Sequence, residues 1–276
     1  MIDLYEILKT ILLGIIEGIT EWLPISSTGH LILADAFIQL NQSDAFKEMF
    51  FVIIQLGAIL AVLVLFWKKL NPFSFKEKSL MINRDILVLW TKILVSCIPA
   101  AIIGLAFDDA IDSVFYNYQT VSITLIIYGV LFIIIELWNH KRNPIIIAHP
   151  QITYRTALII GIFQLLALIP GTSRSGATII GAMLLGTTRT VAAEYTFFLA
   201  IPVMFGASLV KLVKFGFVFT SNELIVLFIG MAVSFCGSIL AIKFLVGYVK
   251  KHDFKVFGWY RIILGIIVIL YFSIFV

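Results

Sequence analysis

Two polar segments interrupt an otherwise very apolar chain, and they carry the residue types best able to do chemistry. Residues 14–30 contain two carboxylates, a run of hydroxyls and a histidine, and residues 161–176 contain hydroxyls, glycines and an arginine. Each is a short apolar helical pattern broken at a proline and followed by another apolar run. Ionisable groups inside apolar sequence are costly and mark functional sites. These two breaks are therefore the first candidates for a site.

Glu17 and Glu21 are spaced i, i+4 in the first segment, so on a helix they share one face. Two carboxylates this close repel each other, and in a site of low dielectric one of them is pushed toward protonation. Such a pair suits acid/base work or the binding of a divalent metal. The alternative is a solvated helix end, but Trp22, Leu23 and Pro24 continue into apolar sequence instead of a polar loop.

Three hydroxyls, Ser26, Ser27 and Thr28, follow this break, and Gly29 and His30 come next. Capping of the helix that begins here would explain one hydroxyl. It does not explain three hydroxyls beside a histidine, although a lone histidine is more often structural. A helix N-terminus gathers unpaired N–H groups and favours a bound anion, and His30 could hold or donate a proton there.

The second break supplies a cation. Thr172, Ser173 and Arg174 lie between Gly171 and Gly176, which permit close approach of the backbone. The planar guanidinium of Arg174 suits phosphate. The alternative is a structural ion pair between Arg174 and one of the two glutamates. Arg174 can serve in both roles if the substrate phosphate competes with the glutamate for it. Together the breaks predict a phosphate site with its own acid/base groups, and the chain has no Walker motif for a nucleotide-driven machine.

The composition requires a membrane to hold these segments. The chain of 276 residues is 61% hydrophobic and only 13% charged, far from the roughly 25% charged residues of soluble domains. No cleavable signal peptide and no nucleic-acid-binding face is evident. Cys97 and Cys236 are expected to be buried thiols. Lys243 and Arg261 lie near the ends of apolar runs and are expected to snorkel toward the interface.

The predicted fold is all-α, polytopic and a single membrane domain. Segments 5–40 and 153–190 each hold two stretches too short to cross a bilayer, which is typical of re-entrant hairpins. The sequence predicts six transmembrane helices, at 48–67, 87–107, 118–138, 192–214, 223–248 and 257–275.

Loop charges orient these helices, since lysine and arginine favour the cytoplasmic side. The loops 68–86, 139–155 and 249–256 are basic, whereas 108–117 holds only Asp108, Asp109 and Asp112 and 215–222 has no charge. Both termini are thus expected outside. Lys211 and Lys214, near the outer end of the fourth helix, fit least well. Two halves, 1–145 and 146–276, each with a hairpin and three spans, must then be inverted relative to each other, as in many transporters.

At these residues the chain resembles the bacterial undecaprenyl-diphosphate phosphatase family of the bacitracin-resistance type. The resemblance covers essentially the whole length and rests on the E-x-x-x-E segment that runs into W-L-P-I-S-S-T-G-H, and on P-G-T-S-R-S-G. It implies a plasma-membrane hydrolase that recycles the lipid carrier of peptidoglycan synthesis on the outer side of the membrane. It also implies a divalent cation, Mg²⁺ or Ca²⁺. The family's functional positions fall on Glu17, Glu21, Ser26, Ser27, Thr28, His30, Thr172, Ser173 and Arg174.

Roles for these residues follow as a hypothesis. Arg174 with the hydroxyls of Ser173 and Thr28 holds the diphosphate, and Ser27 is the candidate nucleophile or else orients a water. His30 is the candidate proton donor or base. Glu21 activates the nucleophile, and Glu17 tunes Glu21 or shares the cation with it.

Two other functions compete with a phosphatase of polyprenyl diphosphate lipid. The inverted repeat suggests a transporter or flippase of polyprenyl phosphate, and a passive lipid-phosphate-binding protein is a third possibility. A carrier needs only a reversible anion site, so two carboxylates and a histidine favour catalysis. Assembly as a homodimer is left open.

Overall fold

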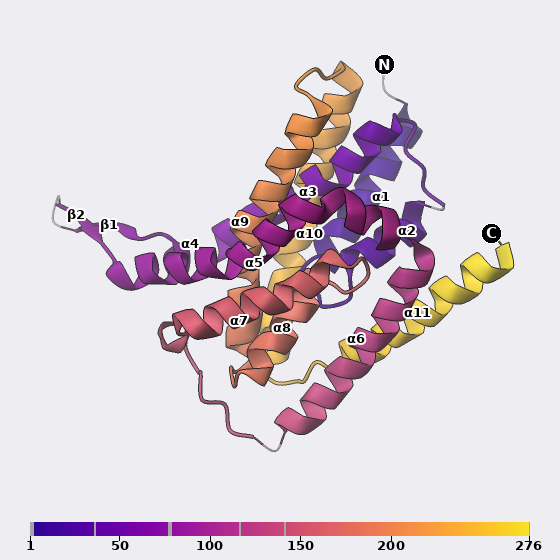
Figure 1. The fold of residues 1–276 in the computed structure, drawn as a ribbon. Helices are drawn as coiled ribbons and strands as arrows, with labels where there is room; N and C mark the ends of the chain where they lie inside the picture. Colours follow the sequence, from indigo (N-terminus) through magenta and orange to yellow (C-terminus); the bar gives the residue numbers. More distant parts are fainter. Residues whose placement is uncertain (1–2, 36, 77–78, 116, 141, 276) are drawn as a thin grey trace.

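The computed structural model is a bundle of helices, and it describes residues 3–35, 37–76, 79–115, 117–140 and 142–275 (Figure 1). In chain order its helices and strands are α1 (Leu4–Thr20), α2 (Ser27–Asp35), α3 (Asp44–Leu65), α4 (Trp67–Leu70), β1 (Phe73–Lys76), β2 (Ser79–Ile82), α5 (Arg84–Phe115), α6 (Tyr118–Asn139), η1 (His149–Gln151), α7 (Tyr154–Leu165), η2 (Leu166–Leu168), α8 (Arg174–Leu184), α9 (Arg189–Phe215), α10 (Ser221–Val249) and α11 (Lys255–Phe275).

Six helices within the described residues are long and apolar enough to cross a membrane, as the sequence predicts. They are α3, α5, α6, α9, α10 and α11. The predicted loop at 108–117 is wrong in its extent, because α5 remains helical to Phe115. Helical backbone satisfies its own hydrogen bonds, so it can continue beyond the apolar stretch. The side chains of Asp108, Asp109 and Asp112 lie outside the described part of the structure.

The basic segment predicted as a loop at 68–86 contains regular secondary structure. Helix α4 continues from the end of α3, and strands β1 and β2 pair antiparallel, with Phe73 opposite Ile82. Figure 1 shows this hairpin projecting away from the helical body. The helical architecture is thus confirmed, with one small two-stranded addition.

The long helices pack around two pairs of shorter helices, α1 with α2 and α7 with α8. Helix α1 packs on α10, α7 packs on α5, and α6 runs beside α11 (Figure 1). Both short helices approach their neighbours closely at a glycine: a Cβ on Gly18 would lie 2.5 Å from the carbonyl oxygen of Ser234, and one on Gly161 would lie 2.3 Å from that of Ser96. Small residues at such crossings are the usual means of close packing in membranes.

Two helix pairs surround the breaks found in the sequence. Helices α1 and α2 contain 17 and 9 residues, and α7 and α8 contain 12 and 11. Most of α8 is buried, and at its side Trp22 packs edge-on against Phe197 of α9, with ring centroids 5.3 Å apart. The irregular backbone of both breaks is therefore covered by protein, as polar backbone at membrane depth must be.

Candidate active site

The two breaks share an unusual backbone conformation. Ser26 and Ser173 have φ values of 73° and 72°, and they are the non-glycine residues with positive φ in the described part of the chain. Each lies directly before a short helix, and its Oγ accepts a hydrogen bond from a backbone N–H, that of Gly29 at 3.3 Å and that of Gly176 at 3.2 Å. Left-handed serine costs about 1–3 kcal/mol and persists where surrounding structure holds it, typically at functional sites.

Glu21 connects the two breaks. Arg174 donates from Nη2 to Glu21 Oε1 at 2.8 Å, and Ser27 donates from Oγ to Glu21 Oε2 at 2.7 Å. Both side chains of the ion pair are largely buried. Ser27 and Arg174 are each the first residue of their helix, α2 and α8. The structure therefore brings the carboxylate, the serine and the guanidinium together, although Arg174 lies 153 residues from Glu21 in the sequence.

The guanidinium of Arg174 is held on more than one side. Its Nη1 donates to the carbonyl oxygen of Thr196 in α9 at 3.0 Å, and its central carbon lies 5.9 Å from the centroid of the Trp22 ring. Ser175, the next residue, donates from Oγ to the backbone oxygen of Glu21 at 3.3 Å and lies 3.1 Å from the hydroxyl of Ser173. This arrangement orients the arginine before any ligand binds.

Glu17 lies one helical turn before Glu21, as the spacing predicts. It is fully buried, and neither of its carboxylate oxygens has a hydrogen-bond partner among the described residues. Gln164 occupies the matching place in the second segment and is likewise buried without a partner in that part of the chain. Because unpaired buried carboxylates are strongly unfavourable, Glu17 is suited to hold a proton or to meet a cation.

His30 is oriented by hydrogen bonds that do not involve Glu21, Ser27 or Arg174. Its Nδ1 lies 2.7 Å from the carbonyl oxygen of Ser26, and its Nε2 lies 2.7 Å from the hydroxyl of Tyr260 in α11. A carbonyl only accepts, so Nδ1 carries the proton in this geometry. The sequence predicts His30 beside the reacting groups, and the structure places it in the same break but in contact with Tyr260.

Cys236 is exposed instead of buried, and Arg261 departs further from its predicted place. It was expected to snorkel toward the interface, yet it is fully buried. It donates to the carbonyl oxygen of Pro24 at 3.3 Å in the first break, and to those of Gly171 at 2.8 Å and Thr172 at 2.9 Å in the second. These carbonyls have no helical partner because the helices are broken there.

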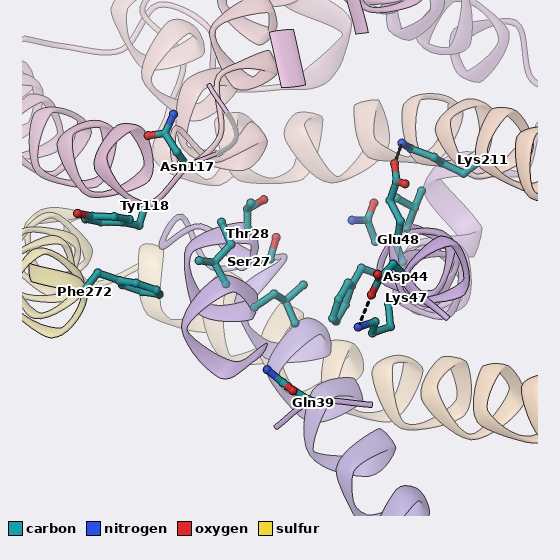
Figure 2. A pocket seen from close by; sticks show the side chains of 15 residues that line it. Ser27, Thr28, Gln39, Asp44, Lys47, Glu48, Asn117, Tyr118, Lys211 and Phe272 are labelled. Atoms are coloured by element: carbon teal, nitrogen blue, oxygen red, sulfur yellow. Dashed lines mark hydrogen bonds and ion pairs between the residues drawn. The ribbon is translucent and has the colours of Figure 1, made fainter. Parts of the chain in front are cut away.

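A cavity of about 900 Å³ opens beside this cluster. Of the predicted site residues, Ser27 and Thr28 line it, so Ser27 is shared by the cavity and the group around Glu21. Figure 2 shows these two residues between an aromatic side, with Tyr118 and Phe272, and a charged side, with Lys47, Glu48 and Lys211. The other predicted residues lie outside the lining, and Thr172 is buried in the second break.

The described residues contain no group of three or more His, Cys, Asp and Glu side chains arranged to hold a metal. The two carboxylates of the first break still fit a hard cation, because Glu17 offers oxygens that have no partner in the described chain. Mg²⁺ is commonly bound by one or two carboxylates together with substrate phosphates and water.

Comparison with known proteins identifies the family of the chain. The model of the family described as bacitracin resistance protein BacA matches residues 10–267. An undecaprenyl-diphosphatase of Desulfitobacterium hafniense is 66% identical over 271 residues, covering 98% of this chain and 97% of that protein. Undecaprenyl-diphosphatase 1 of Clostridium acetobutylicum is 64% identical, and an undecaprenyl-diphosphatase of Enterococcus faecalis is 63% identical, each covering 98% of both chains.

Proposed function

The chain belongs to the bacitracin resistance protein BacA family, and we propose that it hydrolyses undecaprenyl diphosphate to undecaprenyl phosphate and inorganic phosphate. The observation that carries the proposal is the contact between the candidate nucleophile and its base: Ser27 Oγ lies 2.7 Å from Glu21 Oε2 at the wall of a large cavity. A hydroxyl that donates to a carboxylate is prepared to lose its proton as it attacks.

In the reaction that we propose, the diphosphate competes with Glu21 for Arg174. The guanidinium then stabilises the charge on the transferring phosphoryl group, and Glu21 is free to accept the proton of Ser27. Ser27 Oγ attacks the terminal phosphorus, and the bond from that phosphorus to the bridging oxygen breaks, leaving undecaprenyl phosphate. Water then hydrolyses the phosphoserine and releases inorganic phosphate.

A second route uses the same residues without a covalent intermediate. Water attacks the terminal phosphorus directly, Ser27 orients that water, and Glu21 accepts its proton. In both routes the helix N-termini at Ser27 and Arg174 and the hydroxyls of Thr28 and Ser173 bind phosphate oxygens. If substrate displaces the hydroxyl of Tyr260, the free Nε2 of His30 can accept a proton as a base, and it donates one to the leaving group only after the ring has become an imidazolium.

The predicted divalent cation is part of the proposal. Glu17 and Glu21 would hold it, and it would neutralise charge on the diphosphate. Purified protein in detergent is expected to release phosphate from undecaprenyl diphosphate, to lose this activity in a chelator, and to regain it when Mg²⁺ or Ca²⁺ is restored. A steady-state phosphate-release assay measures all three, and full activity in the chelator would contradict the cation.

The same assay separates the enzyme from the transporter alternative. Paired breaks that meet inside a helical bundle also occur in carriers, which is the observation that favours this second function. A flippase moves lipid between two leaflets and releases no phosphate in detergent. A purified protein that releases almost no phosphate in detergent but moves lipid between the leaflets of vesicles would favour the carrier.

We also propose that the chain consists of two inverted halves, 1–145 and 146–276, each beginning with a re-entrant hairpin. Two observations support this. Ser26 and Ser173 share a positive φ, and the first helix of each hairpin packs on the second long helix of the other half, α1 on α10 and α7 on α5. With both termini outside, the site opens to the outer side of the bacterial plasma membrane, as the positive-inside rule predicts. Assembly as a homodimer stays a prediction.

Arg261 is expected to act as a positioning residue. Arg261→Ala leaves the carbonyls of Pro24, Gly171 and Thr172 without their donor, so we expect kcat to fall about 10²-fold while KM changes little. Arg261→Lys keeps a donor and should recover part of kcat. Thermal unfolding in detergent reports whether each variant folds. A folded Arg261→Ala protein with unchanged kcat would contradict this role.

A further inference from the structure

The two breaks differ at the carbonyl that comes directly before the short helix. In the second break, the Ser173 carbonyl accepts the ordinary helical hydrogen bond from the N–H of Ala177 at 2.9 Å. In the first break the matching bond, from the N–H of His30 to the Ser26 carbonyl, is 3.4 Å long. The imidazole of His30 makes the short contact instead, since its Nδ1 lies 2.7 Å from the same oxygen. A side chain therefore does in the first break what the backbone does in the second.

The Ser26 carbonyl matters because it belongs to the peptide that joins Ser26 to Ser27. The orientation of this peptide sets the direction of the Ser27 side chain, whose Oγ donates to Glu21 at 2.7 Å. A left-handed serine such as Ser26 is strained and keeps its conformation only where its surroundings hold it. An imidazole that holds the carbonyl therefore aims the candidate nucleophile at its base.

Tyr260 supports the imidazole from its other side. A neutral ring that donates from Nδ1 has an acceptor at Nε2. The hydroxyl of Tyr260 lies 2.7 Å from Nε2 of His30, and the two ring planes are inclined by only 6°. The partner of one ring nitrogen fixes which nitrogen carries the proton and how the ring is oriented. The phenol therefore keeps the proton on Nδ1, where the Ser26 carbonyl accepts it.

Stability alone does not explain the position of Tyr260. The residue is 44% exposed, whereas the neighbouring Arg261 is fully buried. A half-exposed hydroxyl finds other hydrogen-bond partners when the protein unfolds, so one contact with an imidazole adds little to stability. Arg261 donates to the carbonyl of Pro24 in the same break at 3.3 Å. Helix α11 thus holds two carbonyls of the first break, one directly and one through His30.

We propose that Tyr260 is a positioning residue of the phosphatase reaction. Its hydroxyl keeps the proton of His30 on Nδ1, and that nitrogen holds the carbonyl of Ser26. The peptide that follows then aims the hydroxyl of Ser27 at Glu21. This inference rests on the proposed function, and in it the contact between His30 and Tyr260 is kept throughout the reaction.

Tyr260→Phe removes the hydroxyl and keeps the ring. We expect kcat for phosphate release to fall about tenfold with KM unchanged, because a hydrogen bond that orients the nucleophile is lost and no contact with phosphate is. If Tyr260 instead only blocked a base, the substitution would free Nε2 of His30, and kcat would stay the same or rise. An unchanged or higher kcat therefore overturns the proposal.

A substitution of His30 tests whether Tyr260 acts through it. His30→Asn places an amide N–H near the position of Nδ1, which can donate to the Ser26 carbonyl without help from a phenol. We expect kcat of His30→Asn to exceed that of His30→Ala about tenfold, and adding Tyr260→Phe to His30→Asn should lower kcat no further. Equal losses in the two His30 variants, or a further tenfold loss in the double variant, would contradict the proposal.

Tyr248→Phe is the matched control. Tyr248 also lies beside a histidine, with its ring centroid 4.7 Å from that of His252, but this pair is at the C-terminal end of α10. Removing its hydroxyl should leave kcat and KM unchanged. A tenfold fall in kcat in this variant as well would show that the effect of Tyr260→Phe is not specific to the first break, which would overturn the proposal.

The tautomer of His30 can be measured without catalysis, by ¹⁵N NMR of protein labelled at its four histidines. The His30 signals, identified by their loss in His30→Asn, should show the proton on Nδ1 in the unaltered protein and should shift toward the other tautomer in Tyr260→Phe. Unchanged signals in Tyr260→Phe would refute the role of the phenol. Absence of phosphate release from the unaltered protein would instead contradict the proposed function, and the ¹⁵N signals would still decide whether Tyr260 fixes the imidazole.

Discussion

Replacing Arg174 with alanine is expected to reduce the rate of phosphate release roughly 10³-fold, the scale seen when a positioned arginine is lost from phosphoryl transfer. Arg174 carries the charge nearest to Glu21 and is oriented by Thr196 as well. Without it, the diphosphate loses its main electrostatic partner and Glu21 loses its ion pair. The assay is steady-state phosphate release at saturating substrate.

Two further variants sharpen this experiment. Arg174→Lys keeps the positive charge but cannot form the bidentate hydrogen bonds of a guanidinium, so it should recover only part of the rate. Arg155→Ala removes an exposed arginine in the first turn of α7 and should leave the rate unchanged. Near-normal turnover in a folded Arg174→Ala protein would refute the assignment of Arg174 as the phosphate-binding residue.

Ser27→Ala is expected to reduce the rate of phosphate release by at least about 10³-fold if Ser27 is the nucleophile. When catalytic residues act as a unit, removing one of them costs most of the rate that the whole unit provides. The substitution takes away one hydroxyl that donates to Glu21 and leaves the ion pair with Arg174 in place. Rapid quenching of the unaltered protein with labelled substrate should trap phosphoserine at this position.

Ser208→Ala provides the comparison for Ser27. Ser208 is a buried serine in α9 whose hydroxyl bonds to the carbonyl of Val52, away from the cluster around Glu21. It should retain the normal rate. If Ser27→Ala keeps most of the activity, the covalent route is abandoned and direct attack by water remains.

The membrane helices and the meeting of the two breaks could be predicted because both depend on strong local signals. Long apolar runs identify spans, and a proline followed by hydroxyls identifies a break. Charge alone could match Arg174 with one of the two glutamates, and the ion pair in the structure identifies Glu21 as the partner.

Other features depend on tertiary contacts that no local pattern encodes. Arg261 resembles an interfacial arginine in sequence, and only the crossing of α11 beside the breaks shows which carbonyls it meets. The partner of His30 is likewise 230 residues away in the chain. Strands β1 and β2 follow a weak pattern within a charged segment, which predicts only a loop.

The contacts of Tyr260 and Arg261 have a consequence for biosynthesis. Residues of both breaks emerge from the ribosome and enter the membrane well before α11 does. Until α11 arrives, the carbonyls of Pro24 and Gly171 lack their guanidinium donor and His30 lacks its phenol partner. A nascent or prematurely terminated chain that ends before Tyr260 would therefore carry all of the reacting groups without the contacts from α11 that hold them in place.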